Sequence, residues 1–157
     1  ALLWTLAADT AFARVQAGPN ARLQVGEWLA GAARAGNTVA VVRNYPLEEF
    51  YSPPLTAGVA GVAINLGDDA DPASALARAD FLVVPEPVYR GLDRLGSRHP
   101  KSSTRSLGER LASDEHFELA LSLKLPVELA GVDFGAGFRS QDFFIINPGF
   151  RVYRRKR

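Results

Sequence analysis

The chain has 157 residues, of which 47% are hydrophobic and 22% are charged, and its net charge is +1. This composition excludes a disordered chain and predicts one compact soluble domain, with no apolar run near the roughly 20 residues of a membrane span. The last four residues are all basic, so the rest of the chain is net negative and nucleic-acid binding is not expected. Cysteine is absent, which excludes disulfides, thiol nucleophiles and Cys-based metal sites.

The first 17 residues are expected to form a segment of their own before a single α/β domain over residues 18–157. Methionine is absent, so we expect a processed chain or a fragment. Ala1 to Ala8 are mostly apolar and include Trp4. Two interpretations stay open for them: the interfacial stub of a membrane helix, where Trp is enriched, or an ordinary core-packing segment.

A helix is predicted from the N-cap Asn20 to about Ala35, ahead of the stop signal Gly36-Asn37. Its apolar stripe at helical spacing consists of Val25, Trp28, Leu29 and Ala32. Three mostly apolar runs without polar alternation predict central strands covered on both faces: Thr38–Val42, Val59–Leu66 and Phe81–Val84. Short helices are expected from Pro72 to about Ala79 and around Val88 to Leu95.

The second half of the chain alternates loops and strands. Ser97–Ser106 is predicted to be an exposed loop, and Ser106-x-x-Glu109 has the spacing of a capping box that starts a helix. Odd-numbered apolar residues from Phe117 to Leu125 predict a strand with one wet face. After a loop over Gly131–Gln141, the strands Phe143–Ile146 and Phe150–Tyr153 flank the turn Asn147-Pro148-Gly149.

This order of elements predicts the α/β class. We expect a three-layer, Rossmann-like domain with a mixed, mainly parallel sheet and a C-terminal antiparallel hairpin.

Motifs for catalysis or cofactor binding are missing from the sequence. It has no dinucleotide fingerprint, P-loop or Gly-x-Ser-x-Gly elbow, and both His99 and His116 are expected to be solvated side chains. The acidic run Asp68–Asp71 fits the start of a helix better than a calcium loop. Arg98–Arg105 and the basic tail could meet phosphate or lipid headgroups, but a solvated loop and a frayed tail are preferred. We therefore expect no catalytic residue, no metal and no cofactor.

One arrangement of short motifs is more specific than the candidate features above. It begins with Asn20-Ala21-Arg22, Glu27-Trp28-Leu29, Gly36-Asn37-Thr38-Val39-Ala40, Tyr45 and Tyr51-Ser52-Pro53-Pro54-Leu55. It continues with Ala79-Asp80-Phe81-Leu82-Val83-Val84, Tyr89 and the ending Asn147-Pro148-Gly149-Phe150-Arg151-Val152-Tyr153-Arg154. Over residues 20–154 this pattern resembles the region after the last membrane helix in integral-membrane glycosyltransferases that use polyprenyl-phosphate-linked sugars.

The resemblance implies a C-terminal, extracytoplasmic domain of a mannosyltransferase-like enzyme of the cell membrane. The family's catalytic carboxylates lie between its membrane helices, so this domain would be inactive alone. Its partners would be the membrane domain of the same polypeptide and a glycan acceptor or a polyprenyl-phosphate sugar. The alternative is a free-standing α/β ligand-binding or transferase domain.

A ligand-binding surface is predicted where the strands ending at Val42 and Val84 run into polar and aromatic segments, because α/β sites gather at the carboxyl edge of parallel strands. Its expected members are Tyr45, Glu48, Glu49, Tyr51, Tyr89 and Arg90. The tyrosines would stack on a sugar, and the charged groups would bind hydroxyls or phosphate. In the alternative interpretation, Tyr51 and the nearby prolines only plug one end of the core.

Overall fold

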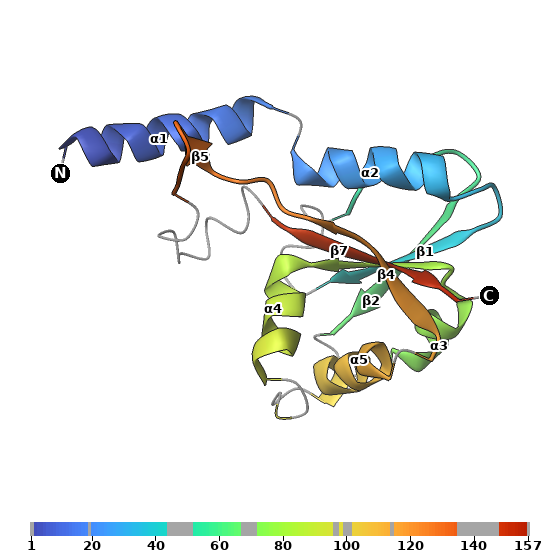
Figure 1. Cartoon of the computed structure of the whole chain (residues 1–157). Helices are drawn as coiled ribbons and strands as arrows, with labels where there is room; N and C mark the ends of the chain where they lie inside the picture. Colours follow the sequence, from blue (N-terminus) through green and yellow to red (C-terminus); the bar gives the residue numbers. More distant parts are fainter. Residues whose placement is uncertain are drawn as a thin grey trace.

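The computed structural model describes residues 2–18, 20–43, 52–66, 72–95, 98, 102–113, 115–134 and 148–156. Its helices are α1 (Leu2–Ala17), α2 (Ala21–Ala32), α3 (Ala73–Arg78), α4 (Glu86–Leu95) and α5 (Ser102–Ala112) (Figure 1). Its strands are β1 (Thr38–Arg43), β2 (Ala60–Asn65), β3 (Phe81–Pro85), β4 (Phe117–Leu123), β5 (Glu128–Leu129), β6 (Val132–Asp133) and β7 (Phe150–Arg155).

Five strands form the main sheet, in the order β2-β1-β3-β7-β4. Strand β1 pairs in parallel with β2 and β3, whereas β7 pairs antiparallel with both β3 and β4. The prediction of a mixed sheet is therefore confirmed, and its parallel pairing lies at the β2-β1-β3 end. Of the predicted C-terminal hairpin, Phe143–Ile146 lies outside the described residues. A separate hairpin, β5–β6, turns at Ala130 and Gly131, which both have positive φ.

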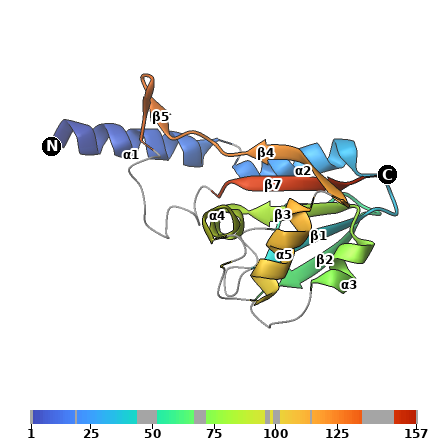
Figure 2. The ribbon, with the colours of Figure 1, turned by 60° about the horizontal axis from the view of Figure 1, so that its bottom comes forward.

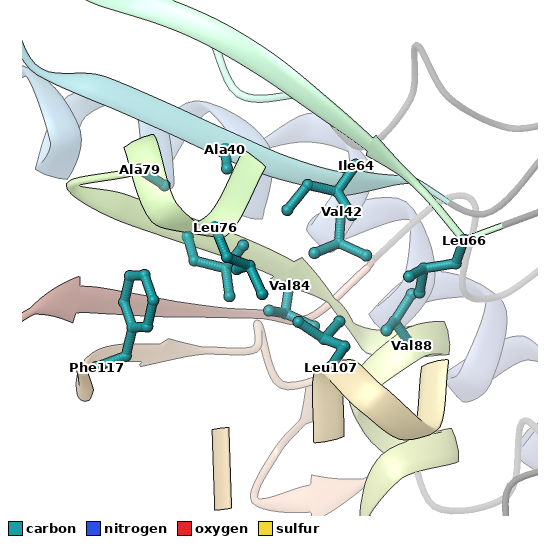
Figure 3. Packing of buried hydrophobic residues seen from close by; sticks show 11 residues of the cluster. Ala40, Val42, Ile64, Leu66, Leu76, Ala79, Val84, Val88, Leu107 and Phe117 are labelled. Carbon is teal, nitrogen blue, oxygen red and sulfur yellow. The ribbon is translucent and has the colours of Figure 1, made fainter. Parts of the chain in front are cut away.

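Helices cover both faces of the sheet, which confirms the three-layer architecture (Figures 1 and 2). Helix α2 packs Val25 and Leu29 on the face that carries Val39, Val41 and Val83. Helices α3, α4 and α5 cover the opposite face, and Figure 3 shows their core side chains meeting those of the strands. The cluster there comprises Ala40, Val42, Ile64, Leu66, Leu76, Ala79, Leu82, Val84, Val88, Leu107 and Phe117.

Helix α2 begins as predicted, because the Asn20 side chain accepts a hydrogen bond from the Leu23 backbone N–H at 2.9 Å. Its end differs from the prediction. The helix stops at Ala32, and Ala32 is exposed while the C-cap Ala33 is buried. Trp28 is half-buried, with its ring edge-on to Phe81 at a centroid distance of 6.1 Å.

The expectation of three strands covered on both faces holds for β1 and β3 but is wrong for β2. All five residues of β3 are buried, as are the four middle residues of β1. In β2 only Ile64 is buried, because this strand forms the edge of the sheet. Gly61 and Ala63 are small and carry no polar side chain, so the sequence of this run resembles that of a buried strand. Most residues of β2 are nevertheless exposed.

The predicted exposed loop over Ser97–Ser106 is wrong from residue 102 onward. Helix α5 begins at Ser102, so Ser106 lies inside the helix and does not cap it. Ser103 and Thr104 are buried, and the Ser103 hydroxyl donates to the carbonyl of Leu66 at 2.9 Å. That distant partner satisfies the polar group, and local sequence cannot reveal it.

The alternation predicted for Phe117–Leu125 is interrupted by a bulge. The register of β4 against β7 shifts between Leu119 and Leu121. Phe117 therefore packs with the α3–α5 side of the sheet, whereas Leu121 and Leu123 pack with the α2 side. Leu119 is 53% exposed, contrary to the single buried face expected.

Helix α1 extends away from the three layers (Figures 1 and 2). Ala8 and Ala11 are buried against Val127 and Phe134, so this part of α1 has its own small core. The first turns are apolar and exposed: Leu2 by 85%, Leu3 by 81%, Trp4 by 62% and Leu6 by 63%. None of the described helices has the length and apolar character needed to cross a bilayer.

The prediction of a frayed basic tail is wrong for its first two residues, because β7 continues through Arg155. The Arg154 guanidinium pairs with Glu118 at 2.5 Å. Arg155 donates from Nε to the carbonyl of Ala79 at 2.8 Å and from Nη2 to that of Leu76. It therefore satisfies carbonyls at the end of α3.

Candidate binding site at the carboxyl edge of the sheet

The strands β3 and β4 end at the same edge of the sheet, and β7 begins there between them (Figure 1). Their register pairs Pro85 with Phe150 and Leu123 with Phe150. The next residues outward are Glu86 after β3, Gly149 before β7 and Lys124 after β4. These three residues, far apart in sequence, therefore meet in one row.

Glu86 makes the most polar contacts in this row and is only 1% exposed. Its Oε1 lies 2.8 Å from Lys124 Nζ and 2.8 Å from Arg90 Nε, one helical turn along α4. Its Oε2 accepts the Gly149 backbone N–H at 2.9 Å. The Glu86 N–H in turn donates to the Gly149 carbonyl at 2.7 Å. A buried carboxylate is stable here because both oxygens have charged or backbone donors.

Gly149 is required by the close packing of this site. A Cβ at this position would lie 2.5 Å from the Tyr89 hydroxyl and 2.9 Å from Glu86 Oε2. Both distances are shorter than a carbon–oxygen contact allows. Glycine lets the backbone of β7 donate to Glu86 without displacing the Tyr89 and Glu86 side chains.

A second group of side chains adjoins the row through Arg151 on β7. Its Nη1 and Nη2 donate to the two carboxylate oxygens of Asp93, each at 2.7 Å. Its guanidinium carbon also lies 4.2 Å from the centroid of the Tyr89 ring, a cation–π contact. Arg151 is therefore fixed between α4 and the sheet.

The Tyr89 hydroxyl stays protonated well above neutral pH. Burial is the main cause that raises its pKa to about 12, and the negative charge of Glu86 adds to it. Arg151 and Arg90 oppose this shift with their positive charges. Tyr89 is thus a neutral group that can donate a hydrogen bond, and not a base.

The charge of this edge favours an anion. Among the described residues, four cations lie along it, Arg43 at the end of β1, Arg90, Lys124 and Arg151, beside the two carboxylates Glu86 and Asp93. The side chain of Arg90 is 55% exposed and that of Lys124 is 38% exposed, so a ligand can reach both. We call Glu86, Tyr89, Arg90, Lys124, Gly149 and Arg151 the carboxyl-edge cluster.

Only part of the predicted surface can be placed. Tyr45, Glu48, Glu49 and Tyr51 lie outside the described residues. Tyr89 and Arg90 do lie on α4 beside the carboxyl end of β3. His116 is exposed, and within the described ranges no group of three or more His, Asp or Glu side chains could hold a metal ion.

Sequence reasoning missed Glu86, Lys124 and Arg151. The alternation in the sequence places Lys124 on the wet face of a strand, and the sequence marks Gly149 only as part of a turn. The pairing of β7 between β3 and β4 brings them together, and the sequence carries no local signal for that pairing.

Two other hollows lie away from the row. One, of about 620 Å³, is at the opposite edge and is lined by charged residues that include Arg34, Asp80, Glu118 and Arg154. The other, of about 450 Å³, lies between α4, α5 and β7 and touches Asp93 and Arg151.

Comparison with known proteins identified no relative: no family model, curated protein or solved structure matches the chain.

Proposed function

We propose that this chain is a non-catalytic domain of a membrane glycosyltransferase that uses a lipid-linked sugar, and that it helps to hold the polyprenyl-phosphate donor. The sequence resemblance suggests this class of enzyme. In the proposal the domain sits on the extracytoplasmic side of the cell membrane and works beside the membrane domain of the same polypeptide.

The observation that carries the proposal is the position of the carboxyl-edge cluster relative to α1. The cationic edge, with Arg90 and Lys124 accessible, lies at the end of the sheet from which α1 projects (Figure 2). The first turns of α1 expose apolar residues, among them Leu3 and Trp4. An apolar helix end and cationic side chains on the same side suit an amphiphilic ligand with a phosphate at a membrane surface.

The domain's contribution is binding and orientation. A phosphate oxygen could accept hydrogen bonds from Lys124 and Arg90, which Glu86 already holds in place. The protonated Tyr89 hydroxyl adds a neutral donor nearby. With no activated nucleophile or paired acid and base recognised, we expect the purified chain neither to hydrolyse nor to transfer sugars.

Vesicle flotation tests the proposal. Phosphatidylcholine vesicles are prepared with and without a few per cent of a polyprenyl-phosphate mannose, and the fraction of protein that floats is measured. We expect the lipid-linked sugar to raise that fraction, Lys124→Met to remove the increase, and Leu3→Asp to lower flotation with both kinds of vesicle. Leu119→Asp is the matched control, because Leu119 is an exposed leucine on β4.

Equal flotation with and without the lipid-linked sugar would contradict the role in donor binding. If flotation is also unchanged by Leu3→Asp, membrane attachment through α1 is wrong as well, and a free-standing ligand-binding domain becomes the better explanation. A sugar transfer activity abolished by one substitution in the purified chain would refute the non-catalytic role.

A further inference from the structure

The groove between α4, α5 and β7 differs from the carboxyl-edge cluster in shape and in charge. Its volume of about 450 Å³ is within the size range of small-molecule sites. Leu92 and Asp93 line it from α4, Glu109 and Leu111 from α5, and Tyr153 from β7. Arg151 also lines the groove and so connects it to the cluster.

We propose that this groove binds a neutral saccharide. This site goes beyond the proposed function, because it needs neither a phosphate nor a membrane. Its occupant would be a sugar unit of a glycan, recognised by hydroxyl groups and by an apolar ring face.

The apolar part of the groove fits such a ligand. Leu92, Leu111 and Tyr153 are partly buried and also pack on the core of the α3–α5 side. They therefore have firm support from behind and present fixed apolar surface to the groove. A sugar ring has one face of C–H groups, which gains stability when it packs on an aromatic or aliphatic surface.

The polar groups of the groove are held in place before any ligand arrives. Arg151 is fixed by its two hydrogen bonds to Asp93, while the Asp93 side chain stays 51% exposed and can accept further hydrogen bonds. Tyr153 is hydrogen-bonded to Arg151, and burial raises the pKa of its hydroxyl, which therefore stays protonated. Glu109 adds an exposed acceptor from the α5 wall. Such groups pair with the hydroxyls of a sugar.

The charge of the groove decides against an anion. Within the part of the chain that the structure describes, two carboxylates, Asp93 and Glu109, line it with one cation, Arg151, so this lining is net negative. A phosphate would be repelled there, in contrast to the carboxyl-edge cluster. A cationic amine is the competing ligand, and the test includes one.

Helices α4 and α5 pack closely against each other beside the groove. A Cβ on Gly108 would lie 2.8 Å from Leu92 Cδ2, so glycine permits the close approach of the two helices. On α5 the exposed Ala112 lines the groove and leaves it open. A large side chain at Ala112 should fill the groove from the solvent side without entering the core.

The experiment is saturation-transfer NMR on the full chain, without vesicles. The probes are the methyl glycosides of mannose, glucose, galactose and N-acetylglucosamine, with putrescine as the cationic probe. We expect at least one glycoside to bind, with millimolar affinity. Ala112→Trp should weaken that binding at least tenfold, while Ala30→Trp, the same change at an exposed position of α2, should not.

The proposal is overturned if none of the four glycosides binds, if putrescine alone binds, or if Ala112→Trp and Ala30→Trp bind the glycoside equally well. Circular dichroism and urea unfolding check that both variants are folded. If Ala112→Trp is unfolded, Glu109→Gln provides the same test from an exposed position, with a loss of affinity expected. Because no lipid is present, these outcomes are independent of the flotation assay.

Discussion

Replacing Glu86 by Gln should destabilise the domain by about 2–3 kcal/mol. Glu86 is 1% exposed, and its two oxygens accept from Lys124 Nζ, Arg90 Nε and the Gly149 N–H. Removing one partner of a fully buried ion pair costs roughly 3–5 kcal/mol. Here the cost is lower, because Arg90 and Lys124 are 55% and 38% exposed and can turn to water. The uncharged amide also has only one acceptor oxygen, so one donor loses its partner, at about 1–3 kcal/mol.

Urea unfolding followed by circular dichroism measures the loss of unfolding free energy. Thermal unfolding should show a matching fall in Tm of roughly 4–12 °C. Glu27→Gln on the exposed face of α2 is the matched control and should change stability by no more than about 0.5 kcal/mol. In a double-mutant cycle, Glu86→Gln and Lys124→Met should cost less together than the sum of the two alone. A loss below about 0.5 kcal/mol for Glu86→Gln would refute the view that this carboxylate organises the edge.

Three further predictions test the fold and the site. Leu82→Asp places a charge at a position with no exposed surface on the central strand β3 and should abolish cooperative unfolding; an unchanged transition would exclude a central position for this strand. Gly149→Ala should lower stability and weaken any binding at the carboxyl-edge cluster, because its Cβ collides with Tyr89 and Glu86; stability equal to that of the unchanged chain would contradict the contact. Because the pKa of Tyr89 is raised to about 12 in the folded state, from 10.0, its contribution to stability should be complete below pH 10 and be lost as the pH rises toward 12. Urea unfolding of the unchanged chain and of Tyr89→Phe, measured across this pH range, tests the prediction. An equal dependence of stability on pH in the two proteins would contradict the raised pKa of Tyr89.

The core of the fold could be predicted from sequence because its signals are local. The runs Val39–Val42 and Phe81–Val84 are apolar at every position, which is typical of strands covered on both faces, and both are central. Asn20 was recognised as a cap from its chemistry alone. The errors arose where distant contacts decide the structure. The edge position of β2 depends on which strands pair, and the buried Ser103 depends on the carbonyl of Leu66.

The bulge in β4 shows a second limit of sequence reasoning. A strict alternation from Phe117 to Leu125 predicts one buried face, but one extra residue between Leu119 and Leu121 moves the later leucines to the other side of the sheet. The local sequence pattern does not predict this extra residue in β4. Only the pairing with β7, which itself comes from the far end of the chain, requires it.

The candidate sites depend on the same strand. Phe150 and Val152 of β7 face the α2 side of the sheet. The odd-numbered residues Gly149, Arg151 and Tyr153 therefore face the α3–α5 side. Gly149 completes the carboxyl-edge cluster, Tyr153 lines the groove, and Arg151 contributes to both. A shift of one residue in the pairing of β7 with β3 would turn all three to the opposite face and bury the wrong side chains. The burial of Phe150 and Val152 therefore also determines the face on which the polar residues of both sites lie. In this protein the pattern of core residues along β7 thus determines a binding surface.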